Sequence, residues 1–368
     1  MKILEIIPDL RDGGAQRFVV DLCNELTNQK DIEVILISFY EISENYIFVS
    51  ELNRNIKTFQ LDKKPGFDFK VLVGLSKIIR KVKPDIIHSH LSTIKYILPF
   101  IVFSRNKFFH TIHTNPKKEP IDKLTRFLLK KLYNYEKIVP ITISNDSSES
   151  FISVYKNRNN IEIFNGRPLI EKTNKFHEIK DKIKGYKKTP NTKVFIHIAR
   201  ISKEKNQILL INVFNKLINE GKDIILIMLG SFNDVALYNK INTIKSENIY
   251  LLGPVSNPVD YLSCSDAFCL TSFYEGMPIT LIEAFQTGCI PVCTPSGGVK
   301  NMISHRVNGI LAEDISEKTF EKAVIEFLLL SKEKVERMKE NCLSTFWEYY
   351  YIKNTASEYL KLFTNSPA

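Results

Sequence analysis

The alternation of short apolar runs, rich in β-branched residues, with stretches of helical spacing constrains the fold of this chain most strongly. In the first half the runs are KILEII, IEVILIS, PDIIHSH, KFFHTIH and KIVPITIS, and helical stretches such as AQRFVVDLCNEL lie between them. A second series begins near residue 193 with KVFIHIA and continues through DIILIMLG, NIYLLG, DAFCLTS and CIPVC. This alternation is typical of parallel sheets with crossover helices, so it predicts an α/β protein with two doubly wound, Rossmann-like domains.

The segment between the two series, residues 165–193, is polar and lysine-rich and has no strong strand pattern. We therefore predict an N-terminal domain over residues 1–170 and a C-terminal domain over 171–351. A chain of 368 residues has room for two such domains, each with its own core.

The composition is that of a folded protein, with 44% apolar and 25% charged residues. No apolar run reaches the length of about 18 residues that a membrane-spanning helix needs. The first apolar run ends at Pro8 and Asp9, which is too short for a signal peptide and favours a first strand. The six cysteines form no C-x-x-C pair, so we expect buried free thiols in a cytoplasmic protein.

The formal net charge of +10 admits three partners: nucleic acid, an anionic membrane surface, or a phosphorylated small molecule. Much of the charge lies in segment 115–137, where apolar residues recur at helical spacing and predict a basic amphipathic helix. Its apolar stripe either faces the core, with solvated lysines outside, or helps the helix to bind anionic lipid. The cations are Lys117, Lys118, Lys123, Arg126, Lys130, Lys131 and Lys137, and the apolar residues are Ile121, Leu124, Leu128, Leu129 and Leu132.

Residues at the carboxyl ends of the predicted strands are the candidates for a binding site, because ligands of open α/β sheets bind there. Gly13 and Gly14 follow the first strand and open a helix, where backbone N–H groups can approach an anion. Arg200 follows the strand KVFIHIA, and Lys205 lies at the start of the next helix. Two cations in these positions are suited to bind two phosphates, although ordinary surface charge is the alternative.

The stretch EGMPITLIE, residues 275–283, has a glutamate at each end of a turn that leads into a helix. Pro278 suits the first helical turn, which puts Glu275 in the preceding loop and Glu283 about 7 Å along the helix axis. At that separation the carboxylates are better placed to accept hydrogen bonds from different hydroxyl groups of one long ligand than to share a proton. With no histidine or third acid adjacent, we predict no metal.

Together these motifs resemble the GT-B fold retaining glycosyltransferases of family 4, the glycosyltransferases of group 1. The resemblance is strongest from Phe195 to Ile303 and looser in the N-terminal half, where NGRPLI lacks the acidic residue that the family often has after NG. It rests on R-x4-K-N at 200–206, LLGPV at 251–255, EGMPITLIE at 275–283, GGAQR at 13–17, PDIIHSHL at 84–91, HTIH at 110–113 and NG at 165–166.

The resemblance implies two Rossmann-like domains that face a central cleft, with the C-terminal helix 352–368 packing back on the N-terminal domain. It also implies four catalytic residues. Arg200 and Lys205 would stabilise the leaving diphosphate, Glu275 would bind hydroxyl groups of the donor sugar, and His113 would approach the donor sugar or the acceptor.

The residues that would bind the nucleotide sugar, on the same resemblance, contribute mainly backbone groups. Glu283 would bind the ribose hydroxyls, Gly14 would bring the first helix to the phosphates, and Val255 would lie near the base. The backbone N–H groups of Gly276, Met277 and Ile279 would complete this set. Among the other histidines, we expect one of His88 and His90 to point to the core and one to the cleft, and His110, His177, His197 and His305 to be structural or surface residues.

The expected function is therefore that of a retaining hexosyltransferase that uses a nucleotide-diphosphate sugar, a UDP-sugar, and a lipid-linked saccharide acceptor in cell-surface polysaccharide biosynthesis. Fixed cations would stabilise the diphosphate, so we expect no cofactor and no metal. Segment 115–137 would bind the protein to the inner face of the cytoplasmic membrane. Two alternatives stay open: an enzyme resembling nucleotide-sugar 2-epimerases, which needs further acid and base groups, and a basic nucleic-acid- or membrane-binding module, although no nucleic-acid motif is present.

Overall fold

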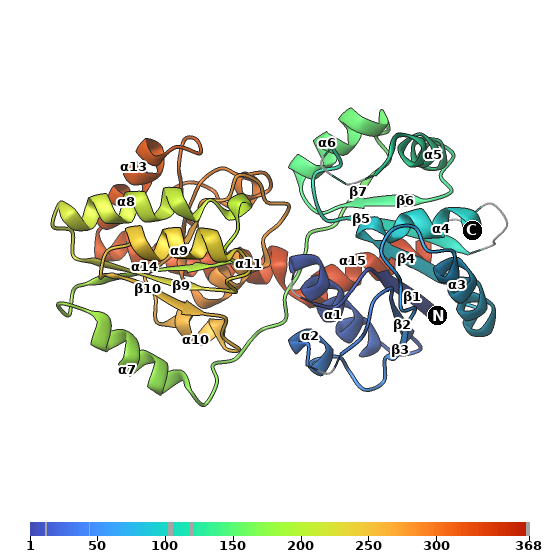
Figure 1. Cartoon of the computed structure of the whole chain (residues 1–368), viewed down its shortest axis with the longest axis horizontal. Coiled ribbons are helices and arrows are strands. Elements are labelled where there is room, and N and C mark those ends of the chain that lie inside the picture. The colour runs from blue at the N-terminus through green and yellow to red at the C-terminus, as the bar shows by residue number, and fades with distance from the viewer. Residues whose placement is uncertain (12, 44, 102–105, 118, 120, 366–368) are drawn as a thin grey trace. The chain divides into compact units, whose positions relative to one another are not determined.

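The protein consists of two compact units, Met1–Pro168 with Tyr350–Ala368, and Leu169–Tyr349 (Figure 1). The computed structural model describes residues 1–11, 13–43, 45–101, 106–117, 119 and 121–365. The predicted boundaries, 170/171 and 351/352, each lie two residues further along the chain. Backbone hydrogen bonds explain the difference, because the Arg167 N–H donates to the Tyr350 carbonyl at 2.8 Å within unit 1, whereas the Ile170 N–H donates to Gln286 Oε1 at 2.9 Å within unit 2.

Unit 1 contains a parallel sheet with the strand order β3-β2-β1-β4-β5-β6-β7. Its strands are β1 (Lys2–Ile7), β2 (Glu33–Ser38), β3 (Lys57–Gln60), β4 (Ile86–His90), β5 (Lys107–Ile112), β6 (Val139–Thr142) and β7 (Ile161–Glu162). Its helices are α1 (Gly14–Thr27), α2 (Ile47–Ser50), α3 (Phe69–Val82), the 3-10 helix η1 (Leu91–Thr93), α4 (Ile94–Ile101), α5 (Lys123–Asn134), α6 (Asn145–Tyr155) and α15 (Ile352–Asn365).

Unit 2 contains a second parallel sheet with the order β10-β9-β8-β11-β12-β13. Its strands are β8 (Lys193–Ile198), β9 (Ile224–Leu229), β10 (Ile249–Gly253), β11 (Ala267–Leu270), β12 (Ile290–Cys293) and β13 (Ile310–Leu311). Its helices are α7 (Phe176–Tyr186), η2 (Lys203–Lys205), α8 (Gln207–Asn219), α9 (Val235–Ile244), α10 (Pro258–Ser263), α11 (Ile279–Thr287), α12 (Val299–Met302), α13 (Glu317–Leu328) and α14 (Lys332–Thr345), and the π-helix η3 (Phe346–Tyr350) leads back to unit 1.

The predicted pair of doubly wound parallel sheets is thus confirmed. In each sheet the strand order reverses once, between β1 and β4 in unit 1 and between β8 and β11 in unit 2. Central parallel strands are buried on both faces, which is why they were visible as continuous apolar runs. Each reversal point is the expected position of a ligand at the carboxyl edge of such a sheet.

The C-terminal helix α15 belongs to unit 1 and packs on α1. The hydroxyl groups of Tyr359 on α15 and Thr111 on β5 lie 2.9 Å apart and form a hydrogen bond, and both residues are buried. Residues that are far apart in the sequence therefore meet beside the centre of the first sheet.

The cysteines are free, and five are buried as predicted, whereas Cys264 is half-buried. In the part of the chain that the structure describes, no helix has both the length and the hydropathy for crossing a membrane.

Candidate active site

An ion pair between Lys205 and Glu275 forms the centre of the candidate site in unit 2. Lys205 ends η2, just after β8, and Glu275 lies in the loop between β11 and α11. Lys205 Nζ lies 2.6 Å from Glu275 Oε1, and the Ser272 hydroxyl donates a hydrogen bond to the same oxygen at 2.6 Å. The sequence assigned these two side chains to different parts of one ligand, and the structure brings them into direct contact.

The backbone around Glu275 is held on two sides, which explains its fixed position. The Phe273 N–H donates to the Glu204 carbonyl at 2.9 Å, and the Gly298 N–H donates to the Glu275 carbonyl at 2.9 Å. Gly297 has a φ of +53°, and a Cβ atom added there would lie 2.0 Å from the Glu275 carbonyl oxygen. Only glycine satisfies both conditions, so the turn at 297–298 keeps this loop in place.

The stretch EGMPITLIE forms the predicted turn and helix, but the helix starts later than its sequence indicated. The helix begins at Ile279, so Pro278 is its N-cap and not part of its first turn. The side chains of Met277 and Ile279 are buried, which leaves their backbone as the part that can meet a ligand. Glu283 is also buried, within the helix.

In the part of the chain that the structure describes, two predicted residues of unit 2 lie at strand ends and form no hydrogen bond or ion pair with Lys205 or Glu275. Arg200 follows β8 and is exposed, and Val255 follows β10 and is half-buried. Gly14 and His113 belong to unit 1, where Gly14 is the exposed first residue of α1. The α1 residue Phe18 packs on the His113 ring, with ring centroids 5.6 Å apart.

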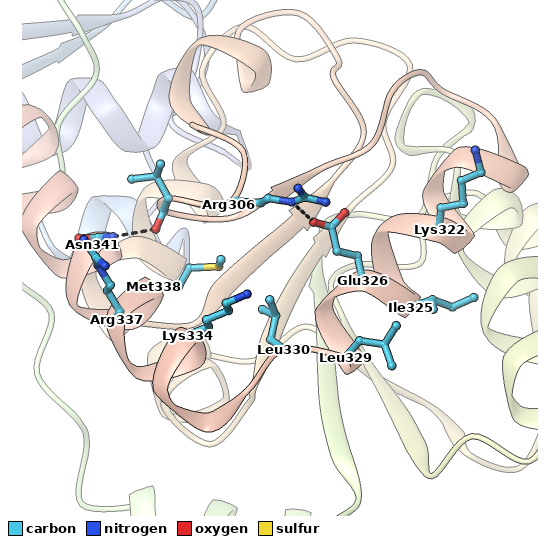
Figure 2. Close-up of a pocket in the computed structure, with 11 residues that line it drawn as sticks. Arg306, Lys322, Ile325, Glu326, Leu329, Leu330, Lys334, Arg337, Met338 and Asn341 are labelled. Atoms are coloured by element: carbon cyan, nitrogen blue, oxygen red, sulfur yellow. Dashed lines mark hydrogen bonds and ion pairs between the residues drawn. The ribbon is translucent and has the colours of Figure 1, made fainter.

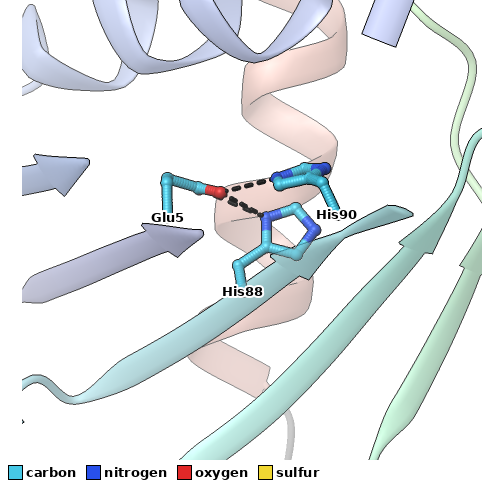
Figure 3. Close-up of side chains that lie close together, drawn as sticks. All are labelled: Glu5, His88 and His90. Atoms are coloured by element: carbon cyan, nitrogen blue, oxygen red, sulfur yellow. Dashed lines mark hydrogen bonds and ion pairs between the residues drawn. The ribbon is translucent and has the colours of Figure 1, made fainter. Parts of the chain in front are cut away.

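A buried carboxylate and three histidines form the polar cluster of unit 1, and Figure 3 shows the carboxylate with two of the histidines, His88 and His90. Glu5 on β1 lies between His88 and His90 on β4, with its Oε2 atom 2.9 Å from His88 Nδ1 and 2.8 Å from His90 Nε2. His90 Nδ1 lies 2.9 Å from Nε2 of His113, which follows β5. On the other side, His88 Nε2 lies 2.7 Å from the Thr111 hydroxyl.

The expectation that His88 and His90 point in different directions is wrong. Both are fully buried, and both contact Glu5. Residues i and i+2 of a strand lie on the same face, so the spacing of this pair already required a common direction. Glu5 itself was missed, although a single carboxylate in the apolar run KILEII signals a buried acid that needs partners.

The protonation states in this cluster are set by burial and by the hydrogen bonds. Burial alone would raise the pKa of Glu5, but the interactions with His88 and His90 outweigh it and lower the pKa to about 2. Burial, together with the neighbouring His88, lowers the pKa of His90 to about 4, and burial lowers the pKa of His113 well below its usual value. At neutral pH, Glu5 is therefore a carboxylate and His90 and His113 are neutral.

The ligand atoms of Glu5, His88 and His90 lie within 4.8 Å of one another, so this trio is a possible metal site. The separations of 2.8 and 2.9 Å between nitrogen and oxygen are those of hydrogen bonds. Around a tetrahedral zinc ion with bonds of about 2.0–2.1 Å, ligand atoms stand about 3.3 Å apart. The observed geometry fits a hydrogen-bonded network better than an ion, and the absence of a metal from the reaction stays a prediction.

A cavity of about 780 Å³ lies elsewhere in unit 2, between α13 and α14 (Figure 2). Its wall includes Lys322, Lys334 and Arg337, and Arg306 forms an ion pair with Glu326 at 2.5 Å. None of the predicted site residues lines it. This cavity depends on the packing of two surface helices, so no pattern in the sequence predicts it.

Both halves of the chain match family models of glycosyltransferases. Residues 12–165 match the model described as Glycosyltransferase Family 4, and residues 178–344 match that described as Glycosyl transferases group 1. The chain is 28% identical to the capsular polysaccharide biosynthesis glycosyltransferase CapH of Staphylococcus aureus over 79% of this chain and 81% of CapH. It is 26% identical to an Escherichia coli UDP-Gal:alpha-D-GlcNAc-diphosphoundecaprenol alpha-1,3-galactosyltransferase over 90% of this chain and 88% of that protein.

Solved structures share the fold. A glycosyltransferase from Rickettsia africae superposes with a TM-score of 0.85 at 18% identity, over 99% of each chain. Anabaena Alr3699/HepE in complex with UDP and glucose superposes with a TM-score of 0.81 at 17% identity, over 100% of each chain. The two family models between them cover both units, and the chain belongs to the GT-B fold glycosyltransferases of family 4, group 1, and is a hexosyltransferase.

Proposed function

We propose that this enzyme transfers a hexose from a UDP-sugar to a lipid-linked saccharide in cell-surface polysaccharide biosynthesis, with retention of anomeric configuration. The observation that carries the proposal is the contact between Lys205 and Glu275 at the carboxyl edge of the second sheet. It combines a cation for a diphosphate with a carboxylate for sugar hydroxyls. The name of the Escherichia coli relative, with its UDP-galactose donor and diphosphoundecaprenol acceptor, supports the choice of substrates.

In the proposed reaction, the bond between the anomeric carbon and the diphosphate oxygen breaks, and negative charge develops on the diphosphate. Arg200 and Lys205 stabilise this charge, which lowers the barrier electrostatically. The acceptor oxygen bonds to the anomeric carbon on the same face, and its proton passes to the departing phosphate oxygen. Glu275 binds donor hydroxyls, and Glu283 binds the ribose.

A thermal-shift screen with UDP, GDP, ADP, CMP and NAD tests the donor site. A ligand that binds the native state raises the melting temperature, so we expect a rise with UDP that is lost in Lys205→Ala and in Glu283→Ala. Lys240→Ala, on the exposed side of α9, is the matched control and should keep the rise. An equal rise in all three variants would refute the assignment of the nucleotide site.

Product analysis separates transfer from epimerisation. We expect sugar transfer only when a lipid-linked acceptor is present. Conversion of the nucleotide sugar in the absence of any acceptor would instead support the 2-epimerase alternative.

We also propose that the protein binds the anionic surface of the cytoplasmic membrane, and the surface of α5 supports this. The single apolar stripe expected for segment 115–137 is divided in the structure: Leu129 packs in the core, whereas Leu124 and Phe127 are 68% and 54% exposed and Leu128 is also exposed. Lys131 Nζ lies 4.7 Å from the centre of the Phe127 ring. An outward apolar stripe with adjacent lysines is the pattern of an interfacial helix.

Lys118 of the basic segment lies outside the described residues. Helices α5 and α6 cover one side of the first sheet near β6 and β7 (Figure 1), so the outward stripe of α5 faces away from that sheet.

Vesicle flotation tests this surface, with vesicles of anionic phosphatidylglycerol and of neutral phosphatidylcholine. We expect binding to the anionic vesicles that falls in Lys130→Gln/Lys131→Gln and in Leu124→Ser/Phe127→Ser. Val235→Ser removes an apolar residue that is 65% exposed on α9 of unit 2, and it should bind like the wild type. Unchanged binding in both double variants would refute the role of α5, and stronger binding to random DNA than to vesicles would favour the nucleic-acid alternative.

A further inference from the structure

Two consecutive hydrogen bonds connect the buried carboxylate of Glu5 to His113. Glu5 Oε2 lies 2.8 Å from His90 Nε2 (Figure 3), and His90 Nδ1 lies 2.9 Å from His113 Nε2. Glu5 and His90 are fully buried, and His113 is 9% exposed. These three side chains are therefore shielded from water, which cannot replace one of them as a hydrogen-bond partner.

The direction of each hydrogen bond follows from the carboxylate. A carboxylate only accepts hydrogen bonds, so the hydrogen between Glu5 and His90 is on His90 Nε2. A neutral imidazole carries one N–H, which leaves His90 Nδ1 as an acceptor. The hydrogen of the second bond must then belong to His113 Nε2, and His113 Nδ1 is left without a hydrogen. The lowered pKa values of His90 and His113 agree with both rings being neutral.

The Nδ1 atom of His113 is buried and has no hydrogen-bond partner among the residues that the structure describes. A buried acceptor without a partner costs about 1–3 kcal/mol, and a donor group from a ligand would remove that cost. His113 follows β5 at the carboxyl edge of the sheet, and its ring contacts His90 at the end of β4. A ligand of this sheet is expected at the same edge, where the strand order reverses between β1 and β4.

We propose that Glu5 and His90 are positioning residues that hold His113 in the tautomer whose Nδ1 accepts a hydrogen bond from a hydroxyl group of the sugar substrate. This inference rests on the proposed function, because it takes His113 as a residue that touches the donor sugar or the acceptor. The role of Glu5 is indirect: its carboxylate fixes the hydrogen on His90, and His90 fixes the hydrogen on His113.

The other branch of the cluster offers a matched control. His88 also donates to Glu5 and contacts Thr111, whose hydroxyl is hydrogen-bonded to Tyr359. Thr111→Val removes a buried hydroxyl of this branch and leaves the atoms between Glu5 and His113 in place. Glu5→Gln, in contrast, removes the negative charge that fixes the hydrogen on His90 Nε2, and it replaces one of the two acceptor oxygens that face His88 and His90 by an amide donor, so a carboxylate no longer sets the hydrogens of the two rings.

Nitrogen-15 NMR of the histidine rings in the full-length protein measures the tautomer directly. We expect His113 in the wild type and in Thr111→Val to carry its hydrogen on Nε2, and Glu5→Gln to shift His113 toward the tautomer with the hydrogen on Nδ1. A wild-type His113 with its hydrogen on Nδ1, or an unchanged tautomer in Glu5→Gln, would overturn the proposal.

Kinetics then connect the tautomer to the reaction. Loss of one transition-state hydrogen bond of about 1.4 kcal/mol lowers kcat about tenfold, so we expect that loss in Glu5→Gln with the affinity for the nucleoside diphosphate unchanged. In a His113→Ala background, Glu5→Gln should lower kcat no further. If Glu5→Gln lowered kcat by a further tenfold in the His113→Ala background, Glu5 would act through general stability and not through His113, which also overturns the proposal. Failure of the wild type to bind any nucleotide would instead refute the proposed function, and the NMR measurement would still decide whether Glu5 sets the tautomer.

Discussion

Removing the charge of Glu275 should strengthen the binding of a nucleoside diphosphate and lower the preference of the site for the corresponding nucleotide sugar. Lys205 Nζ lies 2.6 Å from Glu275 Oε1, so a diphosphate that binds Lys205 must compete with this carboxylate. Glu275→Gln keeps the size of the side chain and removes the competitor. The same substitution weakens the acceptor that the proposal assigns to the sugar hydroxyls.

The size of both effects follows from the exposure of the pair. A hydrogen bond to a charged group contributes about 1.5–3 kcal/mol, and solvent screening reduces this because the Lys205 side chain is 23% exposed and that of Glu275 is 10% exposed. If the Glu275 carboxylate opposes diphosphate binding to Lys205 by about 1–2 kcal/mol, Glu275→Gln should tighten the binding of the nucleoside diphosphate about 5- to 30-fold. The nucleotide sugar gains the same binding free energy at Lys205 but loses the contacts of its hydroxyl groups with the Glu275 carboxylate. The affinity of the variant for the nucleotide sugar, relative to that for the nucleoside diphosphate, should therefore fall about tenfold or more.

Isothermal titration calorimetry measures the two affinities, with the nucleoside diphosphate selected by the thermal-shift screen and with its sugar conjugate. Lys205→Met in the wild-type and Glu275→Gln backgrounds completes a double-mutant cycle, and the gain from Glu275→Gln should vanish when Lys205 is absent. Equal weakening of both ligands by Glu275→Gln would refute the competition, and so would a gain in affinity that persists without Lys205.

Three further predictions concern stability. Burial lowers the pKa of His197 from 6.5 to about 4, so its contribution to the free energy of unfolding is complete above pH 6.5 and is lost as the pH falls toward 4. At about pH 5.5 the free energy of unfolding should be about 1.4 kcal/mol lower than at neutral pH. His197→Gln should not show this pH-dependent loss in urea denaturation. Gly297→Ala should lower the melting temperature and the affinity for nucleotide sugars, because its Cβ would collide with the Glu275 carbonyl. Gly185→Ala in α7 is the control: its Cβ would meet no atom within 4 Å, and alanine favours a helix more than glycine does, so this variant should lower neither quantity. Arg167→Ala removes the 2.5 Å partner of buried Asp21 on α1 and leaves this carboxylate with Arg17 Nε at 3.5 Å. We expect the free energy of unfolding of unit 1 to fall by about 2–3 kcal/mol in calorimetry with unit 2 unchanged, and equal shifts of both units would contradict this role of Arg167.

The sequence predicted those features that depend on neighbouring residues. Each central strand is an apolar run, and EGMPITLIE contains both its turn and its helix, so the positions of Glu275 and Glu283 could be predicted within one residue. The contact between Glu275 and Lys205 could not be predicted, because 70 residues separate the two and their distance depends on the pairing of β8 with β11.

Two expectations from the sequence differ from the structure, the single apolar stripe of segment 115–137 and the opposite directions of His88 and His90, and their physical causes differ. The apolar residues of α5 form an inward and an outward stripe, and helical periodicity alone does not say which stripe faces the core. The direction of His88 and His90, in contrast, followed from strand periodicity and was available from the sequence. Their common partner Glu5 lies 83 residues before His88, and only the neighbouring positions of β1 and β4 bring them together.

The predicted site residues of unit 1 and of unit 2 differ in their charge, and under the proposed function this difference favours different roles for the two units. In unit 2, Arg200 and Lys205 are at least partly exposed cations, which attract an anion but discriminate little among sugar hydroxyls. In unit 1, the charge of Glu5 is fully buried and reaches His113 only through the neutral His90, so His113 offers direction without net charge. A neutral acceptor at a fixed angle distinguishes hydroxyl orientations, because a misplaced donor leaves the buried Nδ1 atom unpaired. Affinity for the diphosphate should therefore reside in unit 2, and orientation of the reacting hydroxyl in unit 1.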